Sequence, residues 1–354
     1  MRSALCLGET MAVLSPDPPV GLAAADRFSC GIGGAESNVA MGLAAFGVPV
    51  SWISRLGEDG FGRKILAALA QHGVDVAQVQ IDRERPTGLY FKDPAAEPEH
   101  SVRYYRQGSA AAAMAPDLLA DPAVAALLAG AGLVHLSGIT PALSPSCRAL
   151  CEQLLRLPRD GRVFSFDLNW RPGLWHGQDA SLLRGLADSA DVLLLGADEA
   201  EQAFGTGSEA ELRTLLPGPE TLVLKKAADS AVSLHRDPAT GRESRTEVPA
   251  LSVALLEPVG AGDSFAAGYL SGLLAGLDET SRLRRGHLAA ACTLTVAGDR
   301  GALPEEAVIE ALLGSSEAQW RATSVAPGRI ESPALPAPAV LPGRPIPAGS
   351  SVLR

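Results

Sequence analysis

Strand-length apolar segments alternate with helical segments along most of this chain, and this alternation limits the fold more than any other feature. The apolar segments lie at 4–8, 50–54, 132–138, 162–169, 191–196 and 221–226. Helical patterns follow some of them, as at 35–47 and 62–73, each of which ends in glycine. Strands that are apolar on both faces are typical of a parallel sheet covered by helices. We therefore expect an α/β fold with three layers, α/β/α, around a mostly parallel central sheet.

Two segments, at about 10–32 and 85–110, do not follow this rhythm. They carry alternating polar and apolar residues, as in TGLYFKD and HSVRYYRQ, with no helical pattern between them. Such alternation is typical of half-exposed antiparallel strands. We expect a small β-sheet that projects from the α/β body and acts as a lid over a cleft.

The sequence changes character after about residue 314. Seven prolines fall between Pro327 and Pro347, among alanine and glycine. We therefore expect one domain over 1–314 and a disordered or extended tail over 315–354. A proline-rich docking ligand is the alternative for the tail.

Composition and charge exclude some classes of partner. The 354 residues carry a formal net charge of −10, and an acidic surface repels nucleic acid. The apolar run among the first residues is too short for a signal peptide, and no apolar run in the sequence reaches the length of a membrane helix. Five cysteines without metal-ligand spacing indicate buried thiols in a reducing compartment. We expect a cytoplasmic protein without nucleic-acid or membrane partners.

The segment EPVGAGDSFAAGYL, at 257–270, is the strongest functional signal. Gly260, Ala261 and Gly262 precede Asp263, which opens an apolar helical face. Asp263 as a simple helix cap is one interpretation. That role does not require three small residues before it, whereas an anion bound by backbone N–H groups at a helix start does. A carboxylate beside a bound phosphoryl group suggests a general base for phosphoryl transfer.

Two other phosphate-binding motifs fit poorly. No GxxxxGK[ST] sequence occurs, so a Walker-type site is not indicated. The GIGGAE segment at 31–36 ends in Glu36 where a dinucleotide-binding fingerprint has glycine. A nicotinamide or flavin dehydrogenase is therefore a weak alternative.

These motifs together resemble the ribokinase-like (PfkB) sugar kinases. GAGD at 260–263 is similar to the anion hole and base of that family, and GGAESN at 33–38 is similar to its N-terminal signature. The resemblance runs from residue 4 to about 305. It implies that Gly33, Gly34 and Asn38 bind sugar hydroxyls, that Asp263 is the base, and that Gly260, Ala261 and Gly262 form the anion hole.

Several segments are similar to the branch of this family that phosphorylates 2-keto-3-deoxygluconate. They include GETM (8–11), RPTGLYFK (85–92), YYRQGSA (104–110) and DLNWRPGLW (167–175). The resemblance places the sugar acid on Gly34, Tyr90, Tyr104, Arg106, Arg171 and Asp299. Arginine suits a carboxylate because its fork donates two parallel hydrogen bonds. A solvated edge-strand charge is the alternative for Arg106, and a turn cap is the alternative for Asp299.

The same resemblance assigns the nucleotide and its metal. It places ATP along Gly196, Lys225, Ala227, Ser230 and His287, and Mg²⁺, through water, near Glu199. Lys225 contacts phosphate or else ends a strand in solvent, and Glu199 is otherwise a solvated acid at a helix start. Ala227 stands where relatives have glycine, which matters only if its φ is positive. Glu257 replaces the usual Asp, so the need for a monovalent cation stays open.

We therefore expect an ATP- and Mg²⁺-dependent sugar-acid kinase acting on 2-keto-3-deoxygluconate, with a possible homo-oligomer through the lid. A fructokinase or ribokinase of the same family is the first alternative. A sugar-acid sensor without catalysis is the second.

Overall fold

A nine-stranded sheet forms the centre of the molecule in the computed structural model, which describes residues 2–96 and 102–342. Its order is β15-β14-β13-β12-β11-β10-β1-β4-β6. The strands are β1 (Ser3–Leu7), β4 (Val50–Ile53), β6 (Val74–Asp75), β10 (Ala131–Ser137), β11 (Val163–Asp167), β12 (Val192–Gly196), β13 (Thr221–Lys226), β14 (Ser230–Arg236) and β15 (Glu243–Pro249). All neighbours from β6 to β13 pair in parallel, and β14 and β15 complete the edge antiparallel. The predicted mostly parallel sheet is confirmed.

Helices cover both faces of this sheet. They are α1 (Ala35–Ala45), α2 (Gly60–Gln71), α3 (Pro122–Gly130), α4 (Pro145–Leu155), α5 (Pro172–Trp175), α6 (Ala180–Asp188), α7 (Ala197–Phe204), α8 (Glu209–Leu215), α9 (Ala261–Leu274), α10 (Glu279–Leu294), α11 (Glu306–Leu313) and α12 (Glu317–Arg321). Short 3-10 turns lie at Leu22–Ala24, Ala111–Ala113, Pro116–Ala120 and Thr140–Ala142. A two-stranded sheet, β5 (Arg55–Gly57) with β7 (Gln80–Asp82), flanks α2.

The alternation of side chains along each strand produces two separate cores. In β12, Val192 and Leu194 pack against α1, α9 and α10, whereas Leu193 and Leu195 pack against the layer that contains α4 and α6. Because strand side chains point to opposite faces in turn, a strand that is apolar throughout must be covered twice. This is the three-layer α/β/α arrangement that the sequence predicts.

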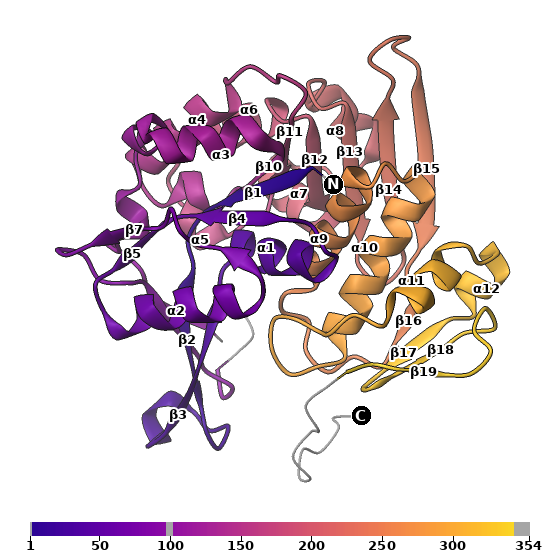
Figure 1. The fold of residues 1–354 in the computed structure, drawn as a ribbon, viewed down its shortest axis with the longest axis horizontal. Coiled ribbons are helices and arrows are strands. Elements are labelled where there is room, and N and C mark those ends of the chain that lie inside the picture. The colour runs from indigo at the N-terminus through magenta and orange to yellow at the C-terminus, as the bar shows by residue number, and fades with distance from the viewer. Residues whose placement is uncertain (1, 97–101, 343–354) are drawn as a thin grey trace.

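A second, four-stranded sheet forms the lid and projects from one end of the body (Figure 1). Its order is β3 (Phe28–Gly33), β2 (Met11–Pro16), β8 (Leu89–Lys92) and β9 (Val102–Tyr105). The lid is where the sequence places it, but it is not wholly antiparallel, since β2 and β8 pair in parallel. Strands from distant segments meet side by side here without a hairpin between them, which permits the parallel pair.

The expectation of a disordered or extended tail from residue 315 is wrong over 315–342. This segment forms α12 and three strands, β17 (Ser324–Ala326), β18 (Arg329–Glu331) and β19 (Ala339–Val340), which extend from β16 (Ser252–Val253) (Figure 1). Pro327, Pro333, Pro336 and Pro338 lie between these short strands. Three apolar side chains of the segment are fully buried: Trp320, Val325 and Ile330. Residues 343–354 of the predicted tail lie outside the described residues.

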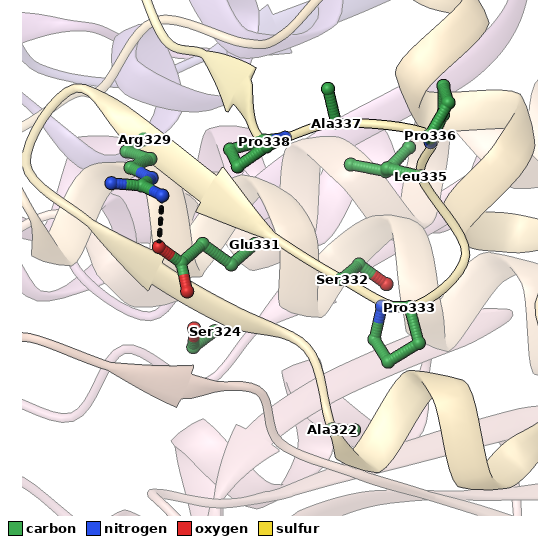
Figure 2. A pocket seen from close by; sticks show the side chains of 10 residues that line it. All are labelled: Ala322, Ser324, Arg329, Glu331, Ser332, Pro333, Leu335, Pro336, Ala337 and Pro338. Carbon is green, nitrogen blue, oxygen red and sulfur yellow. Dashed lines mark ion pairs between the residues drawn. The ribbon is translucent and has the colours of Figure 1, made fainter.

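A hollow of about 410 Å³ opens in this C-terminal segment (Figure 2). Residues between Ala322 and Pro338 line it, and an ion pair of 2.7 Å joins Arg329 to Glu331 beside it. None of the residues that the sequence assigns to substrate, nucleotide or metal lies in this lining. The functional site must therefore be sought elsewhere.

The five cysteines are free thiols, and Cys6, Cys147, Cys151 and Cys292 are buried, whereas Cys30 in the lid is half-buried. Among the described residues, none of the helices combines the length and the apolar character needed to cross a membrane.

Replacing Trp320 by alanine tests whether the C-terminal segment belongs to the folded unit. The indole is fully buried, donates to the Pro249 carbonyl at 2.9 Å and lies 5.0 Å from the Arg284 guanidinium. We expect a loss of about 3–5 kcal/mol in the free energy of unfolding, measured with denaturant. Val340→Ala, at a side chain that is 79% exposed, is the control and should change it by less than about 0.5 kcal/mol. Equal stabilities would mean that the segment is dispensable.

Candidate active site

Polar side chains gather at the carboxyl ends of the central parallel strands. Glu9 follows β1, Asp167 ends β11, Glu199 lies three residues after β12 and Lys225 lies near the end of β13. These strands lie in one continuous part of the sheet, β1-β10-β11-β12-β13. Ligands of open α/β sheets bind at this edge, and the start of α9, with Asp263, comes to the same place, as the contacts below show.

The Asp263 carboxylate is held by two asparagines. The side-chain amide of Asn38, in α1, donates to Oδ2 at 2.9 Å, and that of Asn169, just after β11, donates to Oδ1 at 3.1 Å. All three side chains are buried. Both donors fix the orientation of the carboxylate, and none of the cations in the described part of the chain forms an ion pair with it. This arrangement suits a general base better than a structural ion pair.

Close packing of α1 on α9 sets the Asn38–Asp263 contact. A Cβ atom on Gly42 would lie only 2.5 Å from the Ala267 Cβ, so the two helices approach as closely as a glycine allows. Asn38 and Asp263 each lie four residues, about one turn, before this contact. The helix pair therefore places the amide and the carboxylate side by side at its end.

Burial raises the pKa of the Asp263 carboxyl to about 7. The Asn38 hydrogen bond, Arg171 and Lys225 oppose this rise, and the negative charge of Asp167 adds to it. A carboxyl with a pKa near neutrality both accepts a proton readily and is substantially ionised at pH 7, which is what a general base needs.

The turn before Asp263 is built around Gly260. Its φ is +81°, and a Cβ atom there would lie 2.0 Å from the Asp299 carbonyl oxygen, so only glycine fits. From the sequence, Ala261 and Gly262 were expected in the loop before the helix. The helix begins at Ala261, so both residues belong to its first turn. The first N–H groups of a helix have no partner within it and attract anions.

A lysine lies beside this helix start. The Lys225 Nζ atom is 3.6 Å from the Cβ position of Gly262 and bonds both oxygens of Asp167, at 3.0 and 3.2 Å. Burial works against its charge, but Asp167 and Glu199 raise the pKa of Lys225 above its usual value. Of the two interpretations from sequence, the solvated strand end is wrong, since only 16% of the side chain is exposed.

Glu199 and Arg171 complete this side of the site. The Glu199 carboxylate accepts from the Gly196 N–H at 3.0 Å and lies 3.7 Å from the Arg171 Nη1. Burial raises the pKa of Glu199. Among the described residues, no three His, Cys, Asp or Glu side chains form a metal cage. Two carboxylates, Asp167 and Glu199, on neighbouring strand ends suit Mg²⁺, which keeps several waters and substrate phosphates as ligands.

The predicted sugar side lies under the lid. A Cβ atom on Gly33 would lie 2.5 Å from the Tyr90 hydroxyl and 3.0 Å from Asp299 Oδ2, so these three residues are close together. Gly34 rests on the backbone of Glu9 and Thr10. The Tyr104 ring is 5.5 Å from that of Tyr90 and is 49% exposed.

Arg106 is not the free surface charge of its alternative interpretation. Its Nε donates to Glu9 Oε2 at 2.7 Å, a second nitrogen contacts the same oxygen, and 10% of the side chain is exposed. Ser109 donates to the other Glu9 oxygen at 2.7 Å. The buried Glu9 thus already balances the positive charge of Arg106. Arg171, by contrast, is 44% exposed, and its carboxylate partner is distant.

Two predicted nucleotide residues, Ser230 and His287, bond other parts of the protein, and a third, Ala227, has an unusual backbone conformation. Ala227 has a φ of +47°, in the left-handed region that is strained for alanine. The Ser230 hydroxyl donates to Glu247 at 2.8 Å. His287 is buried against Phe265 and its Nε2 pairs with the Val248 carbonyl at 3.1 Å, and burial lowers its pKa to about 4.

Three residues of this arrangement were not predicted from sequence: Glu9, Asp167 and Asn169. Asp167 and Asn169 belong to DLNW at a strand end, and Asn169 has a φ of +41°, which asparagine tolerates better than most residues. That position was a signal for both. Glu9 belongs to the GETM segment, but its role was not predicted because its partners, Arg106 and Ser109, lie far away in the chain.

The sequence model of the pfkB family carbohydrate kinases matches residues 1–306. The chain belongs to this family. It is 34% identical to the 2-dehydro-3-deoxygluconokinase of Bacillus subtilis (strain 168), over 88% of this chain and 95% of that one. It is 32% identical to the 2-dehydro-3-deoxygluconokinase of Thermoproteus tenax, over 88% and 94%. A crystal structure of a PfkB protein from Polaromonas sp. JS666 matches with a TM-score of 0.72 and 34% identity, over 82% and 95%.

Membership of the pfkB family confirms the predicted resemblance and the ribokinase-like fold. The protein is a carbohydrate kinase, and a dehydrogenase is excluded. The helix start with its basic and acidic side chains is accordingly the place where we look for phosphoryl transfer.

The dependence of kcat/KM on pH tests Asp263 as the base. Because an ionised base is needed, kcat/KM should fall about tenfold per pH unit below an apparent pKa near 7 and be level above it. Asn38→Ala removes a hydrogen bond that lowers this pKa, so the limb should move to higher pH. A profile that stays flat from acid to neutral pH, or a limb that Asn38→Ala leaves in place, would contradict the assignment.

Proposed function

We propose that this kinase transfers the γ-phosphoryl group of ATP to the terminal hydroxyl of 2-keto-3-deoxygluconate, giving 2-keto-3-deoxy-6-phosphogluconate. One observation carries the proposal. The Asp263 carboxylate lies at a helix N-terminus, oriented by two amides, with Lys225 beside the same helix start. Relatives named for this substrate at 32–34% identity support the choice of sugar acid.

Asp263 takes the proton of the sugar hydroxyl while the hydroxyl oxygen attacks the γ-phosphorus. The new O–P bond forms as the bond from phosphorus to the ADP oxygen breaks, and ADP leaves with the electron pair. Negative charge spreads over the transferred group, and the N–H groups of Gly260 to Asp263 and the Lys225 ammonium stabilise it. Asn38 and Asn169 keep the carboxylate aimed at the hydroxyl, because each donates to one of its oxygens.

Glu199 and Asp167 would hold Mg²⁺, with Glu199 acting through water as the sequence resemblance implies. The ion would neutralise charge on the ATP phosphates. ATP itself would run along Gly196, Lys225 and the turn at Ala227 and Ser230, with His287 on the adenine side. The Ser230 hydroxyl and the His287 Nε2 atom already bond other protein groups. For these atoms to contact ATP, the two side chains must rearrange or act through water.

Arg171 is the stronger of the two candidate carboxylate receptors. It is 44% exposed with one carboxylate at 3.7 Å. Arg106 can contribute only the donors that Glu9 leaves free, and it also lies 5.5 Å from the Tyr104 ring. Tyr90, Gly33, Gly34 and Asp299 would meet the sugar hydroxyls, as would the side-chain amide of Asn38, which also donates to Asp263. A neutral sugar, as in a fructokinase or ribokinase, needs no arginine at this place.

We also propose that the enzyme works in the cytosol, where free thiols persist, and that two copies associate through the lid. The lid face opposite Tyr90 carries Phe28, Phe91 and Tyr105 in edge-to-face contact, at 5.5 and 5.6 Å between ring centroids. Phe28 is 39% and Tyr105 is 65% exposed. Exposed aromatic residues on one face are typical of a protein interface.

Light scattering on a sizing column tests the association. The wild-type protein should have twice the mass of one chain, and the Tyr105→Glu variant should have the mass of a single chain. Ile81→Glu, at an exposed side chain outside the lid, is the control and should leave the mass unchanged. A wild-type protein of single-chain mass would refute the interface.

A coupled assay with ATP and a panel of acceptors tests the function. The panel holds 2-keto-3-deoxygluconate, its C4 epimer, fructose and ribose, and we expect kcat/KM to be highest for the first. Asp263→Asn should lower kcat about 10²–10⁴-fold, as loss of a general base does. Arg171→Met should reduce kcat/KM for the acids more than for the neutral sugars.

Preference for fructose or ribose would overturn the substrate while leaving the kinase intact. Calorimetry with ATP separates the remaining alternative, because a sensor that binds sugar acid without nucleotide would give no signal with ATP. Full activity of a folded Asp263→Asn variant would overturn the mechanism.

A further inference from the structure

Lys92 lies on the face of the lid that faces the candidate site. It is two residues after Tyr90 in β8, so both side chains point to the same face of the lid. The Nζ atom bonds Glu257 Oε1 at 2.6 Å and lies 3.4 Å from Asp299 Oδ1. About a quarter of the Lys92 side chain is exposed, and less of Asp299. This is a contact between the lid and the body of the enzyme.

The two carboxylates belong to two loops that together build the anion-binding turn. Glu257 lies three residues before Gly260, and its Oε2 accepts from the Gly298 N–H at 2.8 Å. The Asp299 carbonyl oxygen packs against Gly260, because a Cβ atom on Gly260 would lie 2.0 Å from this oxygen. One lysine therefore joins both loops on either side of the residue whose conformation sets the turn.

Besides joining the two loops, the Lys92 ammonium compensates the negative charges of Glu257 and Asp299. Glu257 and Asp299 are close enough that Glu257 adds to the rise that burial causes in the pKa of Asp299. Burial opposes the charge of Lys92, but Asp299 and Glu257 raise its pKa above the usual value. Without the ammonium, two carboxylates would stand next to a turn that must receive a phosphate, and their field would repel it.

We propose that Lys92 is a positioning residue for phosphoryl transfer: it fastens the lid to the loops at Glu257 and Asp299 and cancels their charge, so that docking of the lid and shaping of the turn at Gly260 occur together. Lys92 acts through these loops and touches neither base nor helix start. The proposal rests on the kinase activity but not on which sugar is the acceptor.

Lys92→Met keeps the length of the side chain and removes the charge. Loss of a charge-assisted hydrogen bond should lower kcat about 10- to 100-fold, with a smaller change in KM for ATP. The matched control is Lys64→Met, the same change at an exposed lysine in α2, outside the lid and the candidate site. It should keep wild-type kcat. A Lys92→Met enzyme with the kcat of this control would overturn the proposal.

A double-mutant cycle with Glu257→Gln separates positioning from a general loss of structure. If Lys92 works by holding and neutralising Glu257, the second change should cost much less in the Lys92→Met background than alone. Losses that multiply independently would overturn the proposal.

Hydrogen exchange gives a readout that needs no substrate. Lys92→Met should speed amide exchange in peptides that cover 257–263 and 298–300, and Lys64→Met should not. If the wild-type enzyme phosphorylates none of the acceptors, the proposed function fails, yet this comparison still decides the role of Lys92. Unchanged exchange in both loops would refute it.

Discussion

The buried Asp263 carboxylate is the group around which the candidate active site is arranged. Burying a charge is costly, and the protein offsets that cost with two neutral amide donors rather than with a direct cation. An ion pair would have kept the carboxyl ionised and weakly basic. Amide donors orient it while burial leaves its pKa near 7. The same choice requires α1, β11 and α9 to meet at one point, so the helix contact at Gly42 and Ala267 serves the chemistry directly.

Positive charge is supplied around this carboxylate in compensated form. Lys225 is paired with Asp167, Arg106 with Glu9, and Lys92 with Glu257 and Asp299. A chain with a net charge of −10 that binds anions must concentrate cations locally. Pairing keeps these cations ordered, and Arg171 stays the most open of them. Arg171 therefore has more of its side chain free to meet a substrate carboxylate than Arg106 has.

The sequence was informative wherever a pattern is local. Strands β1, β4, β10, β11, β12 and β13, the glycine ends of α1 and α2, and the helix start at Asp263 follow from periodicity and turn residues, whereas the two-residue edge strand β6 does not. The roles of Glu9, Lys92 and Asn169 were missed because each depends on a partner more than ninety residues away in the chain. The sequence was misleading at 315–342, where proline content outweighed a few large apolar residues, Trp320 among them, that short strands suffice to bury.

The small C-terminal sheet has a consequence for how the active site is built. Strand β17 pairs in parallel with β16, and the Ala254 N–H donates to the Val325 carbonyl at 2.9 Å. Three residues later the chain reaches Glu257 and then the turn at Gly260. A segment that follows far later in the chain therefore anchors the residues that lead into the turn, so a nascent chain that has already formed its central sheet still lacks this support for the turn at Gly260 until residue 325 has emerged.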